Sequence, residues 1–136
     1  MARVAKQSIE REKRRGETTV LADLHQNGDC PISAREIWQA AQQGDALAQR
    51  LVRQTGCRLG EIMAILIDLL NPECIIVGGL ALRMGEALLA PARDTVKQEA
   101  LPSSAKVCRI SASSLGEQIG DIAALCVATG EMDDVQ

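Results

Sequence analysis

Two consecutive glycines, Gly78 and Gly79, are the residues whose type and position most clearly suit chemistry in this chain of 136 residues. They follow the run Cys-Ile-Ile-Val at 74–77, which lacks polar alternation and predicts a short strand covered on both faces, as in an α/β sheet. A helical pattern begins at Leu80. Glycines beyond a buried strand let the backbone approach a ligand closely, and open α/β sheets bind ligands at that end. The pair is therefore either the edge of a ligand site or a tight strand-to-helix turn.

Other residue types that could do chemistry lack a suitable spacing. Five cysteines lie 27, 17, 34 and 18 residues apart, which matches no close-pair zinc or redox motif: Cys30, Cys57, Cys74, Cys108 and Cys126. Most have apolar neighbours, so they are interpreted as reduced core residues rather than metal ligands. The single histidine, His25, has no cysteine or carboxylate at ligand spacing, and no Gly-x-x-x-x-Gly-Lys loop is present. The sequence therefore predicts no metal ligands and no catalytic residue.

Composition narrows the function classes. Fifteen Lys and Arg against 18 Asp and Glu give a net charge of −3, which argues against a chain-wide nucleic-acid surface. Trp38 is the only aromatic residue, so stacking on single-stranded nucleic acid has almost no platform. No apolar run reaches the roughly 18 residues that a membrane span needs, and the charged start leads into no signal-peptide core. A cytoplasmic protein without membrane or direct nucleic-acid contacts is expected.

Residues 1–32 predict a basic helix followed by a loop. The first fifteen residues carry six basic and two acidic side chains, with only a weak apolar stripe. This segment either contacts an anionic partner or is a solvated helix, and the second interpretation is favoured because a charge run usually marks a solvated face.

Residues at the start of the next segment predict a helix over 34–43. Ser33 with Glu36 three residues later forms a capping box, in which each side chain satisfies a free N–H. Gly44 suits the left-handed cap that closes this helix, and Asp45 suits the N-cap of the following one.

That following helix, over 46–70, has the clearest pattern in the chain. Its predicted apolar stripe comprises Ala48, Leu51, Val52, Thr55, Leu59, Ile62, Met63, Leu66, Leu69 and Leu70. Gly56, Gly60 and Ala64 form a row of small residues at four-residue spacing, although each glycine costs about 1 kcal/mol of helix propensity. We expect the sheet or a neighbouring helix to pack closely against this row.

After the central glycines the pattern predicts a helix over 80–99 with a break near Pro91, a second strand over 107–110 and a last helix over 115–128. Two strands separated by such a helix make a right-handed parallel βαβ unit. Two strands alone do not make a stable sheet. The chain therefore has the pattern of the second half of a larger fold, with an acidic tail over 131–136.

The order and spacing of several short motifs resemble the carboxyl-terminal half of the ROK proteins, which are bacterial sugar kinases such as glucokinases and related sugar-responsive repressors. The resemblance covers about residues 33–128. The motifs are Gly44-Asp45 with Ala48, Leu59-Gly60, the Leu-Leu-Asn-Pro-Glu run at 69–73, the strand with Gly78-Gly79, Gly85-Glu86 and Leu115-Gly116.

This resemblance implies a helix-rich α/β fold, a partial ribonuclease H-like lobe of the actin/hexokinase ATPase type with about two parallel strands and four to five helices. Residues 33–130 would form the lobe. Gly78 and Gly79 would line the nucleotide site, with the start of the next helix beside them. The cofactor of the parent protein would be ATP with Mg²⁺, and none is expected for this chain alone.

The family's catalytic features are not in this sequence. The Asp-Gly phosphate loop, the catalytic Asp, the sugar-binding residues and the cysteine-rich zinc motif of these kinases would precede Met1. Asp121 also stands where the family commonly has Ala. The expectation is an inactive carboxyl-terminal fragment of a glucokinase-like hexose kinase. The alternatives are the sensing or dimerising part of a ROK repressor and a non-catalytic association module.

Partners follow from the incomplete sheet. The faces of the sheet and of the Gly56/Gly60 helix would be exposed in a monomer, as an apolar patch larger than soluble monomers tolerate. We therefore expect a homodimer or higher oligomer, together with contact to the missing amino-terminal lobe.

Overall fold

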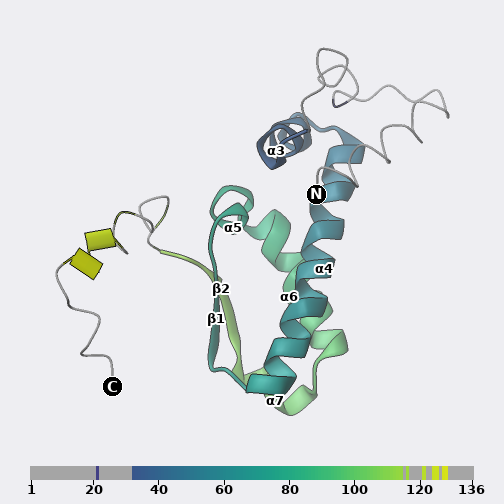
Figure 1. Ribbon diagram of the computed structural model, residues 1–136. Helices are drawn as coiled ribbons and strands as arrows, with labels where there is room; N and C mark the ends of the chain where they lie inside the picture. The colour runs from purple at the N-terminus through teal and green to yellow at the C-terminus, as the bar shows by residue number, and fades with distance from the viewer. Residues whose placement is uncertain are drawn as a thin grey trace.

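The computed structural model describes residue 21, residues 32–114, and residues 116, 121, 124, 125, 127 and 128. The elements in chain order are α3, α4, β1, α5, α6, α7 and β2, and Figure 1 shows the long helices α4 and α6 beside the pair of strands. The expected basic helix, the acidic tail, His25, Cys30 and Cys126 lie outside the described residues, as does most of the expected last helix.

Helix α3 (Ala34–Gln42) begins with the predicted capping box. The Ser33 side-chain oxygen accepts from the Glu36 N–H at 3.2 Å, and the Glu36 carboxylate accepts from the Ser33 N–H at 2.7 Å. The hydrogen bond from the Ser33 N–H, together with one that the Ser33 hydroxyl donates to the same carboxylate at 2.7 Å, lowers the pKa of Glu36. The capping box therefore fixes where α3 starts and which of its side chains face inward.

Helix α4 (Ala46–Leu70) also begins as predicted, because the buried Asp45 caps it by accepting from the Ala48 N–H at 2.8 Å. It ends at Asn71, which has a left-handed backbone with φ of 45°. The predicted row of small residues is buried against helix α6 (Glu86–Glu99), not against the sheet. A β-carbon on Gly60 would lie 2.4 Å from the Ala92 carbonyl oxygen, so the two backbones approach more closely than any side chain permits.

The chain between the strands is divided at a different residue from the one predicted. Helix α5 (Leu80–Met84) ends at Gly85, whose φ of 51° side chains rarely adopt, and α6 follows. Pro91 lies inside α6, so the expected break there is wrong. The α6 helix tolerates the proline ring, which lies against the bare backbone of Gly56.

The two strands, β1 (Cys74–Val77) and β2 (Arg109–Ala112), are parallel, which confirms the predicted βαβ unit. The second strand begins two residues later than predicted, because helix α7 (Pro102–Val107) takes up Val107. The Arg93 side chain on α6 donates to the Ile110 carbonyl oxygen at 3.0 Å and also pairs with Glu86 at 2.6 Å. The hydrogen bond to Ile110 ties α6 to β2, while the pair with Glu86 lies within α6.

Only one face of the sheet is covered by the described residues, so the expectation of coverage on both faces is wrong for this part of the chain. Ile75, Val77 and Ile110 pack against the two apolar clusters beneath the sheet. Ile76, on the opposite face, is 67% exposed.

The predicted apolar stripe of α4 is buried in its first half, whereas in its second half Met63 is buried and most of the other members are exposed. The first half is buried at Ala48, Leu51 and Val52. Toward the end of the helix a set of apolar side chains faces outward with exposures between 40% and 75%, and we call it the outer apolar face: Ile62, Ile65, Leu66, Leu69 and Leu70. The expected exposed apolar face of α4 is thus present, and it lies on the side of the helix away from α6.

The predicted fold class is confirmed, since the described part of the chain contains two parallel strands and five helices. None of the helices among the described residues is long and apolar enough to cross a membrane.

Candidate functional site

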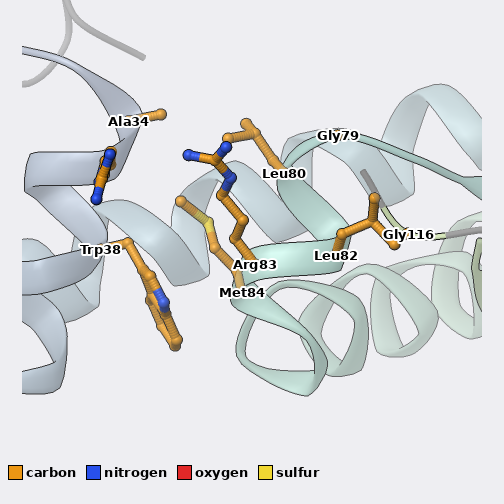
Figure 2. A pocket seen from close by; sticks show the side chains of 9 residues that line it. Ala34, Trp38, Gly79, Leu80, Leu82, Arg83, Met84 and Gly116 are labelled. Atoms are coloured by element: carbon orange, nitrogen blue, oxygen red, sulfur yellow. The ribbon is translucent and has the colours of Figure 1, made fainter. Parts of the chain in front are cut away.

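The described residues line an open cavity of about 570 Å³ between α3 and α5, beside the turn that follows β1. Figure 2 shows side chains from both helices around it. Its size falls within the roughly 300–1,000 Å³ typical of small-molecule sites. The residues that line it are Ala34, Arg35, Trp38, Gly79, Leu80, Leu82, Arg83, Met84 and Gly116.

Of the two glycines predicted from the sequence, the structure places Gly79 on the wall of this cavity and does not include Gly78 among its described lining residues. Gly79 has φ of 57° and ψ of −109°, a conformation that favours glycine. A β-carbon built on either glycine would meet no atom within 4 Å. The requirement for glycine at residue 79 is therefore conformational, and the space beside both residues is open.

The local sequence explains how α3 and α5 present their side chains. Arg35 and Trp38 are three residues apart, so they lie on neighbouring positions of one helix surface. On α5, the buried Ala81 packs in the core, while Leu82, Arg83 and the buried Met84 line the cavity.

The cavity wall is positively charged at Arg35 and Arg83, and the described lining contains no carboxylate. The family resemblance implies that the start of the next helix lies beside the nucleotide site. Helix α5 is only five residues long, however, so its dipole is small and the two guanidinium groups supply the charge instead. The site thus combines an aromatic side chain, two cationic side chains and a stretch of bare backbone.

Sequence reasoning missed Arg35, Trp38 and Arg83 as site residues. Only one signal could have found any of them: Trp38 is the single aromatic residue of the chain and follows Arg35 by three positions. Nothing in the local pattern indicates that α3, which ends at Gln42, and α5, which begins at Leu80, face each other across a cavity.

The described cysteines do not form a metal or disulfide site. Cys57, Cys74 and Cys108 are free and half-buried, and the described residues include no group of three potential metal ligands. Alternation along the strand places Cys74 on the face of Ile76, whereas Cys108 packs with the cluster beneath the other face. Burial raises the pKa of Cys108, with a smaller contribution from Cys74 and an opposing hydrogen bond from the Ile75 backbone.

Alkylation of Cys108 by iodoacetamide should therefore require a higher pH than alkylation of an ordinary cysteine, whose pKa is about 8.5. The folded chain holds the thiol proton to higher pH than the unfolded chain does. The stabilising contribution of Cys108 is thus fully present below the pKa that its thiol has in the unfolded chain. It is lost as the pH rises through the pKa that the thiol has in the folded chain. Mass spectrometry of the Cys108 peptide between pH 7 and 10 gives the midpoint. The same chain in urea is the control, and equal midpoints in both states would contradict the prediction.

The ROK family model matches residues 7–131. A glucokinase of Halalkalibacterium halodurans is 30% identical over 122 residues, which are 90% of this chain and 36% of that protein. The DNA-binding transcriptional repressor Mlc of Escherichia coli is 28% identical over 88 residues, which are 65% of this chain and 22% of the repressor.

A solved structure of a ROK family transcriptional regulator, a homologue of the Escherichia coli Mlc protein, superimposes with a TM-score of 0.65 at 26% identity. The match covers 82% of this chain and 27% of the regulator. The chain therefore spans about a fifth to a third of the length of these relatives, which include both glucokinases and repressors.

Proposed function

Because this chain belongs to the ROK family, we propose that it is the carboxyl-terminal part of an ATP-dependent hexose kinase of the glucokinase kind. In this proposal it carries the adenosine edge of the active site and works in the cytoplasm. The parent protein transfers the γ-phosphate of ATP to a hexose hydroxyl.

The cavity beside Gly79 is the observation that carries this proposal. It lies where the chain leaves the carboxyl end of β1, the position at which open α/β sheets bind nucleotides. An aromatic side chain with guanidinium groups on the same wall suits a ligand that has a flat base and a negative charge. A glucokinase relative that aligns with 90% of the chain supports the kinase class.

Phosphoryl transfer by this chain alone is not part of the proposal. The reaction needs a positioned nucleophile and a metal ion that neutralises the phosphate charge. The described wall of the cavity offers cations but no carboxylate that could hold Mg²⁺ or accept the sugar's proton. In the proposal, the missing amino-terminal lobe supplies these groups, and Mg²⁺ arrives with ATP in the assembled parent.

A fusion protein tests the proposal. The amino-terminal part of the Halalkalibacterium halodurans glucokinase, up to the start of the aligned segment, would be joined to this chain and assayed for glucose phosphorylation. The fusion should phosphorylate glucose, whereas this chain alone should not. In a matched fusion with Gly79→Val, the rate should fall, because a β-branched residue does not adopt the positive φ of that turn. A folded fusion without activity would refute the kinase assignment, and activity of the isolated chain would refute its expected inactivity.

The second candidate function is the sensing or dimerising part of a ROK repressor, which the alignment with Mlc favours. Reading the gene in frame upstream of Met1 separates the two. In this family a helix-turn-helix before the sugar lobe indicates a repressor, whereas a phosphate loop without one indicates a kinase.

We also propose that a second copy of the chain covers the outer apolar face. Ile62, Ile65 and Leu69 recur at three- and four-residue steps, the spacing of a two-helix seam. An antiparallel pair of α4 helices centred between residues 65 and 66 would bring Ile62 against Leu69, and Ile65 against Leu66, of the other copy. The outer apolar face thus suits self-association through an apolar seam between two α4 helices.

A further inference from the structure

The indole of Trp38 is the only aromatic surface that this sequence can offer a ligand, since it contains no other tryptophan and no tyrosine or phenylalanine. It lines the cavity and is half-buried, packed against the core cluster that includes Ile37 and Leu88. Because these core contacts hold the ring, part of its surface is presented to the cavity in a fixed position. A fixed aromatic surface beside bare backbone is the arrangement that base stacking uses.

The cavity also has a cationic part. Figure 2 shows Arg83 and Met84 extending from α5 toward α3. The Trp38 ring extends from α3 and lies on the opposite side of Met84 from the Arg83 guanidinium group in this view. The Met84 thioether can contact one aromatic ring system, and Arg35 adds a second guanidinium group from α3. The lining therefore combines a soft, apolar region for a base with charge for an anion.

We infer that Trp38 is the base-stacking residue of this cavity, which takes a purine nucleotide with its base against the indole and its phosphate toward Arg35 and Arg83. The inference rests on the proposed function, which supplies ATP as the ligand. It goes beyond that function because the indole of Trp38 and the guanidinium groups of Arg35 and Arg83 all belong to the present chain. Base recognition is thus retained here without the missing lobe, although the sequence led us to expect no cofactor for the isolated chain.

Fluorescence tests this inference directly, because Trp38 is the only tryptophan and every change in emission comes from this site. Adenosine and AMP should quench the emission in a saturable manner. Ribose 5-phosphate, which has the phosphate but no base, should leave it unchanged at the same concentrations. AMP should bind more tightly than adenosine because of the two guanidinium groups.

Three variants separate base stacking from phosphate binding and from folding. Trp38→Ala should weaken AMP binding in calorimetry by about 5- to 150-fold, the range that base stacking on an aromatic residue covers. Trp38→Phe keeps an aromatic face and should stay within a few-fold of the wild type. Arg35→Gln should weaken AMP binding but leave adenosine binding unchanged. Circular dichroism of each variant verifies that the helices are intact.

The outcomes for this inference and for the proposed function are distinguishable. AMP binding that neither quenches Trp38 nor responds to its replacement would place the base elsewhere and overturn the inference, while an active fusion protein would still support the kinase. No AMP binding by the wild-type chain at millimolar concentration would also overturn it. Tight binding of ribose 5-phosphate with the same quenching would show an anion site without base recognition, which contradicts it as well.

Discussion

Replacing Gly60 with alanine should destabilise the protein by about 1–3 kcal/mol, although alanine is the better helix former. In an exposed helix the exchange would gain up to about 1 kcal/mol of propensity. Here the added β-carbon would lie 2.4 Å from the Ala92 carbonyl oxygen and 2.7 Å from the Thr95 β-carbon. The first of these atoms belongs to the backbone of α6, so relief requires the two helices to move apart. The steric cost therefore exceeds the gain in propensity.

Urea unfolding followed by circular dichroism at 222 nm measures this change. Gly56→Ala should behave similarly, since its β-carbon would lie 2.5 Å from the Leu88 carbonyl oxygen. Glu61→Ala is the matched control, because residue 61 is the exposed neighbour of Gly60 on the same helix, and its stability should stay within about 0.5 kcal/mol of the wild type. A stabilised Gly60→Ala variant would show that α4 and α6 do not pack as closely as the structure describes.

Replacing Ile65 with glutamate should convert the proposed dimer into a monomer. Ile65 is 60% exposed in the single chain, so the change leaves the fold of the monomer intact. In the antiparallel pair, the glutamate of each copy would lie against Leu66 of the other copy. Losing two buried apolar side chains, at about 1.5–3 kcal/mol each, weakens the dimer by at least about a hundredfold. Light scattering on a size-exclusion column, over a range of protein concentrations, gives the mass.

Gln98→Glu is the control for this second change, because it adds the same charge at an exposed position of α6, away from the outer apolar face. It should leave the dimer unchanged. A wild-type chain that stays monomeric at all concentrations would refute self-association and count against the interpretation of the chain as part of a larger fold.

The sequence alone determined the features that depend on local hydrogen bonding and on side-chain spacing. The capping box at Ser33, the N-cap at Asp45, the length of α4 and the position of β1 follow from residues within one or two turns of each other. The close contact at Gly56 and Gly60 was also predicted, because buried small residues at four-residue spacing have no other common purpose. The family was recognised from the order of such local motifs.

Tertiary structure decided the rest. The break at Gly85 instead of Pro91 depends on a backbone angle that the sequence does not state, and the later start of β2 depends on the short helix α7 before it. The apolar residues of α4 are similar on two sides of the helix, and only the position of α6 shows which side is buried. The cavity was not predicted, because Trp38 and Arg83 belong to helices far apart in the chain. Their proximity arises from packing across the core, and no pattern within either helix encodes it.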